Sequence, residues 1–258
     1  MIVYIIIGII SLFLLLLVFL RKIKNFLYFQ PFPAFNYNSL DGVKDVWLKF
    51  NDKGDKLHCW YYQSSDKKRT VLFCHGNAGN IGIRQSILQT MINHGISFFI
   101  FDYRGFGKSD GRTFMESIYE DANICYKYLK NKLKIKDITI LGESIGSYPA
   151  SKLAKTYDIK KLILIGGINS IYTVVESLIP IFFVKWLVWG DFNVGANLLD
   201  YKGKTMLMHS PTDRIVHIKN AVKNLKICGK DKCKLVKVKG GHNSMELDWG
   251  EIKSFILN

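Results

Sequence analysis

One pentapeptide of this chain has the residue types and the spacing of a nucleophilic serine. Residues 142–146 read Gly-Glu-Ser-Ile-Gly, and glycine on both flanks allows a strand-to-helix turn that is too tight for a Cβ atom. Its neighbours fit this context, because residues 137–141 are typical of a strand and residues 147–154 can form a helix. We therefore interpret Ser144 as a nucleophile for acyl transfer; the alternative is an incidental serine in a structural turn.

A serine hydroxyl does not ionise at neutral pH, so Ser144 needs a base, and His242 is the best placed of the six histidines. It lies in the glycine-rich loop 240–243, after the last expected strand, where a loop can bring the imidazole to the serine. The other histidines precede the nucleophile or belong to other elements: His58, His75, His94, His209 and His217.

Asp213 is the candidate acid that would orient the imidazole and stabilise its charged form. It follows a strand expected at 204–209 and lies between Ser144 and His242, which gives the chain order serine, acid, histidine. Asp191 and Asp200, in the stretch of the possible cap, are alternatives, whereas Asp231 lies before the last strand in a lysine-rich turn. A helix cap or a partner of Arg214 is the other interpretation of Asp213.

Acyl transfer also needs two N–H donors for the oxyanion of the tetrahedral intermediate. The backbone N–H of Ile145, which follows the nucleophile, is one candidate. The backbone N–H of Asn77, in the glycine-containing loop 75–80, is the other. A phosphate-binding loop is the rival interpretation of residues 75–80, but the Gly-Lys-Ser/Thr ending of such loops is missing.

Strand and helix patterns alternate around these residues. Short apolar strands are expected at 45–50, 57–63, 70–74, 96–101, 137–141, 161–165, 204–209 and 233–238. Helical spacing of apolar residues is found at 83–94, 115–132, 147–157, 218–225 and 251–256. Strands that are apolar on both faces predict the α/β class, with a mostly parallel sheet covered by helices on both faces.

The stretch 171–201 interrupts this alternation. It is rich in large apolar side chains such as Phe182, Trp186 and Trp189, and it falls where a short cap over a site would be inserted. A pair of core helices explains the same composition equally well.

The N-terminal segment predicts a membrane anchor over residues 1–24, followed by a globular domain over 25–258. Residues 2–20 carry no charge, and about 19 apolar residues suffice to cross a membrane as a helix. Arg21, Lys22 and Lys24 follow at once, which predicts a domain on the cytoplasmic side. A cleaved signal peptide would need a basic start and a small-residue cleavage site, and a buried core helix would have a polar face.

The composition of the chain indicates which classes of binding partner to expect. The net charge of +15 favours a negatively charged partner, although drift toward a Lys-, Ile- and Asn-rich composition explains it as well. The lysines are spread along the chain without a nucleic-acid motif, so an anionic membrane face is the better candidate than nucleic acid. The five cysteines fit neither a disulfide framework nor a CxxC pair, and no metal or cofactor is expected.

Together the motifs resemble those of the α/β-hydrolase superfamily. Residues 75–80 (HGNAGN), 102–109 (DYRGFGKS) and 142–146 (GESIG) look like its Bem46-like branch, which includes the abhydrolase domain-containing proteins of types 13 and 17. The basic-aromatic stretch 21–33 is similar too. The resemblance implies the α/β-hydrolase fold. It also puts the family nucleophile on Ser144, the acid on Asp213, the base on His242 and an oxyanion donor on Asn77. The chain departs from the family's pattern at His209-Ser210 and at Arg214.

The expected function is therefore that of a serine hydrolase that cleaves ester or thioester bonds through an acyl-enzyme. Some members of the family act as thioesterases on S-acylated proteins, and the anchor favours a lipidic or other acyl substrate near a membrane. A serine peptidase is one alternative, although nothing resembles the added domain of the larger oligopeptidases. A non-catalytic binding protein is another, but it would be expected to lack a member of the triad.

Overall fold

A central twisted sheet positions everything else in the molecule. The computed structural model describes residues 4, 6–12, 15, 28–31, 37–66, 69–178, 188 and 192–258. Within these residues, eight strands form one sheet in the order β10-β9-β8-β7-β4-β6-β3-β2. From β10 to β6 all neighbours are parallel, whereas β3 is antiparallel to both β6 and β2. The strands are β2 (Lys44–Lys49), β3 (Lys56–Tyr62), β4 (Arg69–Cys74), β6 (Phe98–Phe101), β7 (Asp137–Glu143), β8 (Lys161–Ile165), β9 (Lys204–His209) and β10 (Cys233–Lys237).

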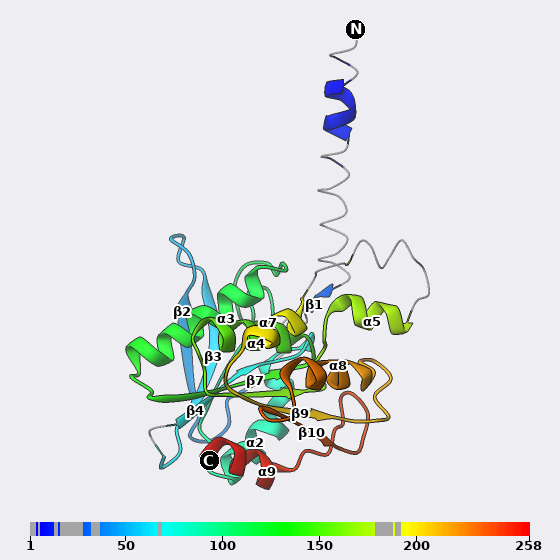
Figure 1. The fold of residues 1–258 in the computed structure, drawn as a ribbon. Coiled ribbons are helices and arrows are strands. Elements are labelled where there is room, and N and C mark those ends of the chain that lie inside the picture. Colours follow the sequence, from blue (N-terminus) through cyan, green and yellow to red (C-terminus); the bar gives the residue numbers. More distant parts are fainter. Residues whose placement is uncertain are drawn as a thin grey trace.

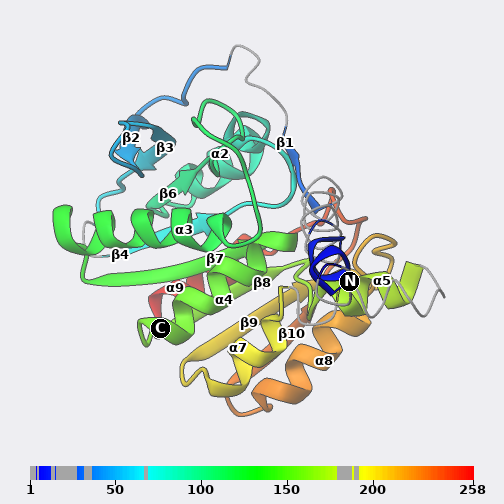
Figure 2. The same cartoon turned by 90° about the horizontal axis from the view of Figure 1, so that it is seen from above.

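Helices cover both faces of this sheet, as Figures 1 and 2 show. The helices α2 (Gln85–Asn93) and α9 (Trp249–Leu257) lie on one face. The other face carries α3 (Ser117–Lys127) with the π-helical turn η2 (Tyr128–Lys132), α4 (Ser147–Thr156), α7 (Val194–Asp200) and α8 (Lys219–Cys228). This arrangement confirms the predicted mostly parallel sheet with helices on both faces.

Burial explains why the sequence forms this sheet. Strand β4 shows the alternation: Val71 and Phe73 belong to the core cluster under α2 and α9, whereas Leu72 and Cys74 belong to the cluster under α3 and α4. Because successive side chains point to opposite faces and both faces are covered, every one of them must be apolar. The edge strand β2 is mostly exposed and correspondingly rich in polar residues.

The connections leave a crevice at the carboxyl ends of β4 and β7. The chain leaves β4 through α2 and returns beside it as β6, then crosses through α3 to the opposite side of β4 as β7. Where successive connections diverge in this way, the loops after the two central strands separate, and ligands bind between them. The loop after β4 holds Asn77, and the loop after β7 holds Ser144.

The stretch 171–201 is described in two pieces, α5 (Ile171–Leu178) and α7. In α7, Val194 and Leu198 are buried in the same core cluster as α4, so this end of the stretch packs as part of the body. Residues 179–187 and 189–191 lie outside the described residues, and a cap over 171–201 stays a prediction.

Residues 4, 6–12 and 15 are helical, and most of the anchor predicted at 1–24 lies outside the described residues. Within the part of the chain that the structure describes, every helix is too short or too polar to cross a membrane.

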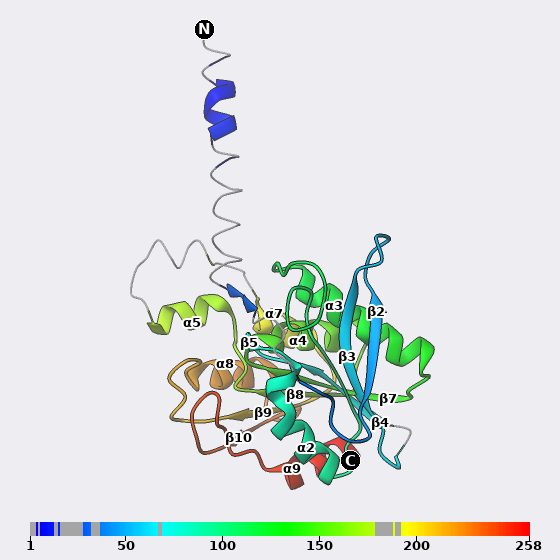
Figure 3. The ribbon, with the colours of Figure 1, turned by 180° about the vertical axis from the view of Figure 1, so that it is seen from behind.

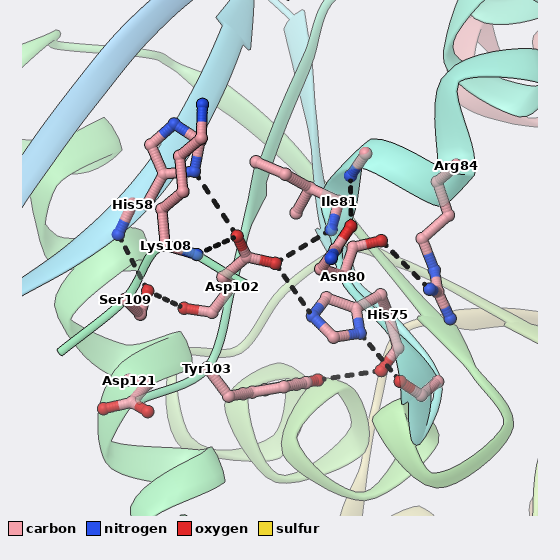
Figure 4. A network of polar contacts seen from close by, with 12 residues as sticks. His58, His75, Asn80, Ile81, Arg84, Asp102, Tyr103, Lys108, Ser109 and Asp121 are labelled. Atoms are coloured by element: carbon pink, nitrogen blue, oxygen red, sulfur yellow. Dashed lines mark hydrogen bonds and ion pairs between the residues drawn. The ribbon is translucent and has the colours of Figure 1, made fainter. Parts of the chain in front are cut away.

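A buried carboxylate, Asp102, joins the loops that follow β4 and β6 (Figure 4). Its Oδ1 accepts the backbone N–H of Ile81 at 2.8 Å, and its Oδ2 accepts the hydroxyl of Tyr37 at 2.9 Å. His58 Nδ1 lies 3.3 Å from the same Oδ2. Burial alone would raise the pKa of Asp102, but these donors and the nearby His75 outweigh it and hold the pKa below its usual value. Asp102 therefore stays ionised and fixes the start of η1 (Ile81–Arg84).

His75 lies beside this carboxylate with no exposed surface. Its Nδ1 donates to the carbonyl of Gly76 at 2.7 Å, its ring packs 4.6 Å from that of Tyr103, and its carbonyl accepts the Tyr103 hydroxyl. Burial, helped by the charge of Arg84, lowers the pKa of His75 to about 4. The imidazole is therefore neutral near neutral pH and serves as a packed, hydrogen-bonded support for the loop.

This burial predicts acid sensitivity that originates at His75. The unfolded chain binds a proton at this side chain near pH 6.5, but the folded protein does so only near pH 4. Between these values the unfolded state binds more protons, so the free energy of unfolding falls as the pH is lowered. We expect the free energy of unfolding, measured by urea denaturation, to decrease between pH 7 and pH 4.5. This decrease should be about 2–3 kcal/mol larger for the wild type than for His75→Asn. Equal falls in the two proteins would contradict this origin, whatever their absolute stabilities.

Candidate active site

Ser144 sits on a sharp turn between β7 and α4. Its φ angle is +52°, a left-handed conformation that costs a non-glycine residue about 1 kcal/mol or more. The 3-10 turn η3 (Ser144–Gly146) links the strand to the helix. A Cβ atom at Gly146 would overlap the carbonyl oxygen of Cys74, and one at Gly142 would lie 2.7 Å from the carbonyl oxygen of Gly146. Gly146 thus allows this turn to approach the end of β4, and Gly142 allows the start of α4 to fold back closely over β7.

The structure brings Ser144, His242 and Asp213 into one chain of hydrogen bonds. The Oγ of Ser144 lies 2.9 Å from Nε2 of His242, and Nδ1 of His242 lies 2.7 Å from Oδ2 of Asp213. An ionised carboxylate has no proton to give, so Nδ1 must be the donor in the second bond. That tautomer leaves the lone pair of Nε2 free to accept the serine proton.

Asp213 is 2% exposed and is surrounded by donors. Its Oδ1 accepts the backbone N–H groups of Ile215 and Val216, each at 2.9 Å. Burial would raise the pKa of Asp213, but the neighbouring His209 and His242 and the N–H of Val216 outweigh it and hold the pKa well below its usual range. The carboxylate is therefore ionised at any pH at which the protein would work.

His209 is a supporting residue that the sequence reasoning missed. Its Nε2 lies 2.6 Å from the carbonyl of Val216 and 3.4 Å from Oδ2 of Asp213. It therefore holds the loop 210–216 against the end of β9 and adds a second imidazole beside the acid. The one signal in the sequence was its place four residues before Asp213, at the end of a strand.

The loops that carry the acid and the histidine are joined directly. Strands β9 and β10 are parallel neighbours, so the loops that follow them leave the sheet side by side. The hydroxyls of Ser210 and Thr212 both donate to the carbonyl of Gly240, and the backbone N–H of Gly241 donates to the hydroxyl of Ser244. These contacts fix the backbone on both sides of the Asp213–His242 pair.

An ion pair between Arg84 and Glu143 joins the turn that carries Ser144 to the segment that follows β4. Arg84 Nε donates to Oε2 of Glu143 at 3.1 Å, and the same oxygen accepts the N–H of Gly76 at 3.1 Å. Arg84 also donates to the carbonyl of Ala78 at 2.7 Å. Burial would raise the pKa of Glu143, but Arg84 and this N–H lower it, so the pair is charged. Glu143, the residue before the serine, therefore holds loop 75–80 next to Ser144.

A segment from the N-terminal part of the chain meets the same loop. Strand β1 (Gln30–Pro31) pairs in parallel with β5 (Ala78–Gly79), and the two are neighbours in Figure 3. The backbone N–H of Gln30 donates to the side-chain oxygen of Asn77 at 3.0 Å. Just before it, the buried rings of Tyr28 and Phe29 pack against Phe192, with ring centroids 5.5 and 5.9 Å apart. Asn77 is thus held from the outside by main chain that follows the predicted anchor.

Among the described residues, no group of three or more His, Cys, Asp or Glu side chains is arranged to hold a metal ion. The aspartates weighed against Asp213 lie elsewhere or outside the described residues: Asp200 pairs with Lys155, Asp231 is exposed, and Asp191 is not described.

The chain is similar to known proteins along most of its length. Residues 65–190 match the family model described as serine aminopeptidase, S33. The chain is 31% identical to alpha/beta hydrolase domain-containing protein WAV2 of Arabidopsis thaliana over 189 residues, which are 69% of this chain and 59% of that protein. It is 26% identical to alpha/beta hydrolase domain-containing protein 17B of Homo sapiens, with coverage of 79% and 70%.

A solved structure of the esterase Pf2001 of Pyrococcus furiosus shares the fold. Its TM-score is 0.69 at 18% identity, covering 83% of this chain and 90% of that one. Since identity this low bears on architecture alone, the assignment comes from the family model and the curated relatives. The chain therefore belongs to the α/β-hydrolase superfamily, and its relatives include several alpha/beta hydrolase domain-containing proteins.

Proposed function

We propose that this hydrolase cleaves ester or thioester bonds through an acyl-enzyme, with Ser144 as nucleophile, His242 as base and Asp213 as the orienting acid. The observation that carries the proposal is the unbroken pair of hydrogen bonds from Asp213 through His242 to Ser144, of 2.7 and 2.9 Å. This geometry meets the requirement that nucleophile, base and orienting group lie within hydrogen-bond reach of one another.

In the proposed reaction, Ser144 Oγ attacks the acyl carbonyl carbon while Nε2 of His242 takes its proton. The buried carboxylate of Asp213 stabilises the imidazolium that forms. The backbone N–H groups of Asn77 and Ile145 donate to the oxyanion. The carbon–oxygen or carbon–sulfur bond then breaks, and His242 returns the proton to the leaving atom. Water, activated by the same imidazole, hydrolyses the acyl-enzyme and restores Ser144.

The substrate class follows from the surroundings of the site. The predicted anchor at 1–24 would hold the domain on the cytoplasmic side of a membrane, and the net charge of +15 suits an anionic surface. Segment 28–31 lies against loop 75–80, which holds the proposed oxyanion donor. This segment follows the predicted anchor within a few residues, so the loop would lie near the membrane. A lipidic acyl group, or an acyl group on a molecule near the membrane, fits this position.

The description of the matched family raises a second candidate, an aminopeptidase. Such an enzyme needs an acidic side chain that is free to bind the α-amino group of its substrate. Glu143 is the carboxylate next to the nucleophile, and it is already bound to Arg84 and to the N–H of Gly76. We therefore favour the acyl-ester hydrolase, and amino-acid anilides provide the test for the other activity.

Ser144→Ala tests the nucleophile. Removing the hydroxyl should lower kcat for p-nitrophenyl esters by about 10⁶-fold, to the background rate, and should abolish labelling by a fluorophosphonate probe. Ser254→Ala, at an exposed position of α9, is the matched control and should behave as the wild type. Labelling of the Ser144→Ala protein equal to that of the wild type would end the serine mechanism.

Asp213→Asn tests the acid. An amide at this position stabilises the wrong imidazole tautomer, so kcat should fall by about 10⁴-fold while KM changes little. Asp200→Asn alters an exposed carboxylate that the sequence alone left as an alternative, and it should retain wild-type kcat. If Asp200→Asn were the slower of the two, the acid would be misassigned.

Asn77 tests the support of the oxyanion loop. Asn77→Ala keeps the proposed backbone donor but removes the oxygen that accepts the Gln30 N–H, whereas Asn77→Asp keeps an acceptor. Because one such bond contributes about 0.5–1.5 kcal/mol, kcat should fall two- to tenfold in Asn77→Ala with KM nearly constant, and less in Asn77→Asp. Equal kcat values for both variants and the wild type would show that this contact does not position the loop.

A further inference from the structure

A cavity of about 540 Å³ opens beside His242 and is not accounted for by the catalytic groups themselves. It lies between α2 and the segment 242–249, which connects the catalytic histidine to α9. His242 and Glu143 are among the residues that line it, whereas Ser144 does not line it. A cavity of this size is within the range of small-molecule sites in proteins.

Half of the residues that line the cavity are apolar, and most of the larger side chains among them are only partly covered by the rest of the protein. Ile83 is 51% exposed, and Ile87, Met245, Leu247 and Trp249 are half-buried along the same groove. Five large apolar side chains converging on one hollow are unusual for free surface, because each loses the gain from burial. A bound apolar group would recover that gain.

The polar atoms of the cavity favour a neutral ligand. Its two charged residues, Arg84 and Glu143, form an ion pair with each other and are further bound to main-chain groups. Hydroxyl and amide groups remain along the walls at Ser86, Thr90 and Asn243. A charged ligand would therefore find no opposite charge to pair with, whereas one or two neutral hydrogen bonds are within reach.

The position of the cavity relative to the catalytic groups indicates which half of the substrate it would bind. The acyl carbonyl must lie between Ser144 and the donors at Asn77 and Ile145. The leaving atom must instead lie at Nε2 of His242, which gives it the proton when the tetrahedral intermediate collapses. His242 itself lines the cavity, as do residues 243–245, so the cavity is the nearest space for the group attached to the leaving atom.

We propose that this cavity binds the leaving-group half of the substrate, a neutral and mainly apolar alcohol or thiol; the inference rests on the proposed function. When the carbon–oxygen or carbon–sulfur bond breaks, its electron pair goes to the leaving atom, which takes the proton from His242. The acyl group stays on Ser144, and the released alcohol or thiol occupies the cavity. Leaving-group selectivity is then set by α2 and segment 242–249, on the opposite side of the sheet from α5.

Ser86→Trp, in the full-length protein, tests this assignment, because it places a large ring in the cavity from an exposed position of α2. Gln89→Trp is the matched control, an exposed residue of the same helix that does not line the cavity. One substrate series keeps the butyryl group and varies the alcohol from ethanol to hexanol and 2-naphthylethanol. The other keeps ethanol and varies the acyl chain from acetyl to dodecanoyl.

In Ser86→Trp, kcat/KM for the hexyl and naphthylethyl esters should fall at least about tenfold relative to ethyl butyrate, and the acyl-length profile should match that of the wild type. Gln89→Trp should match the wild type in both series. A changed acyl-length profile with an unchanged alcohol profile would assign the cavity to the acyl chain and overturn the inference. So would a Ser86→Trp protein with both profiles unchanged.

Retained turnover of ethyl butyrate separates this result from failure of the enzyme. If the wild type hydrolysed no member of either series faster than Ser144→Ala, the proposed function itself would fall. If it hydrolysed ethyl butyrate and Ser86→Trp changed neither profile, only the cavity assignment would fall.

Discussion

The hydrogen bond between Asp213 and His242 is the constraint on which the rest of the site depends. A carboxylate that is almost fully buried would ordinarily take up a proton, and it would then no longer fix the imidazole. Here two backbone N–H groups and two imidazoles surround it and keep its pKa low. The ionised acid holds the proton of His242 on Nδ1, which leaves Nε2 facing Ser144. Because β9 and β10 are parallel neighbours, the loops that follow them leave the sheet side by side. Asp213 and His242 lie in these two loops, so the sheet brings them within hydrogen-bond distance.

Two further carboxylates, the buried Asp102 and the partly buried Glu143, arrange the loops without a direct part in the proposed chemistry. Asp102 binds the start of η1 and the hydroxyl of Tyr37, and Glu143 binds Arg84 and the N–H of Gly76. Both are held ionised by donors that outweigh burial. If the loop moved, each carboxylate would lose the donors that compensate its charge, so few alternative loop arrangements are tolerated. We infer that they keep loop 75–80 in one conformation, with Asn77 beside the turn that carries Ser144.

Different segments lie next to the two ends of the candidate site, at Asn77 and at His242. On one side, the backbone N–H of Gln30 binds the side chain of Asn77, and the neighbouring rings of Tyr28 and Phe29 pack on Phe192. On the other side, the cavity between α2 and segment 242–249 extends from the imidazole.

The sequence by itself determined the elements and the motifs. Apolar periodicity placed most strands within one or two residues, because burial on both faces leaves a local signature in β4, β7 and β8. The glycines of the pentapeptide and the order of serine, acid and histidine singled out three side chains. What only the tertiary structure decided were contacts between residues far apart in the chain. Asp213 binds His242, whereas Asp200 binds Lys155; His209 supports the acid; Gln30 binds Asn77 across 47 positions. Local patterns record which face of an element is buried, but not which side chain it meets, since that depends on how the whole sheet folds.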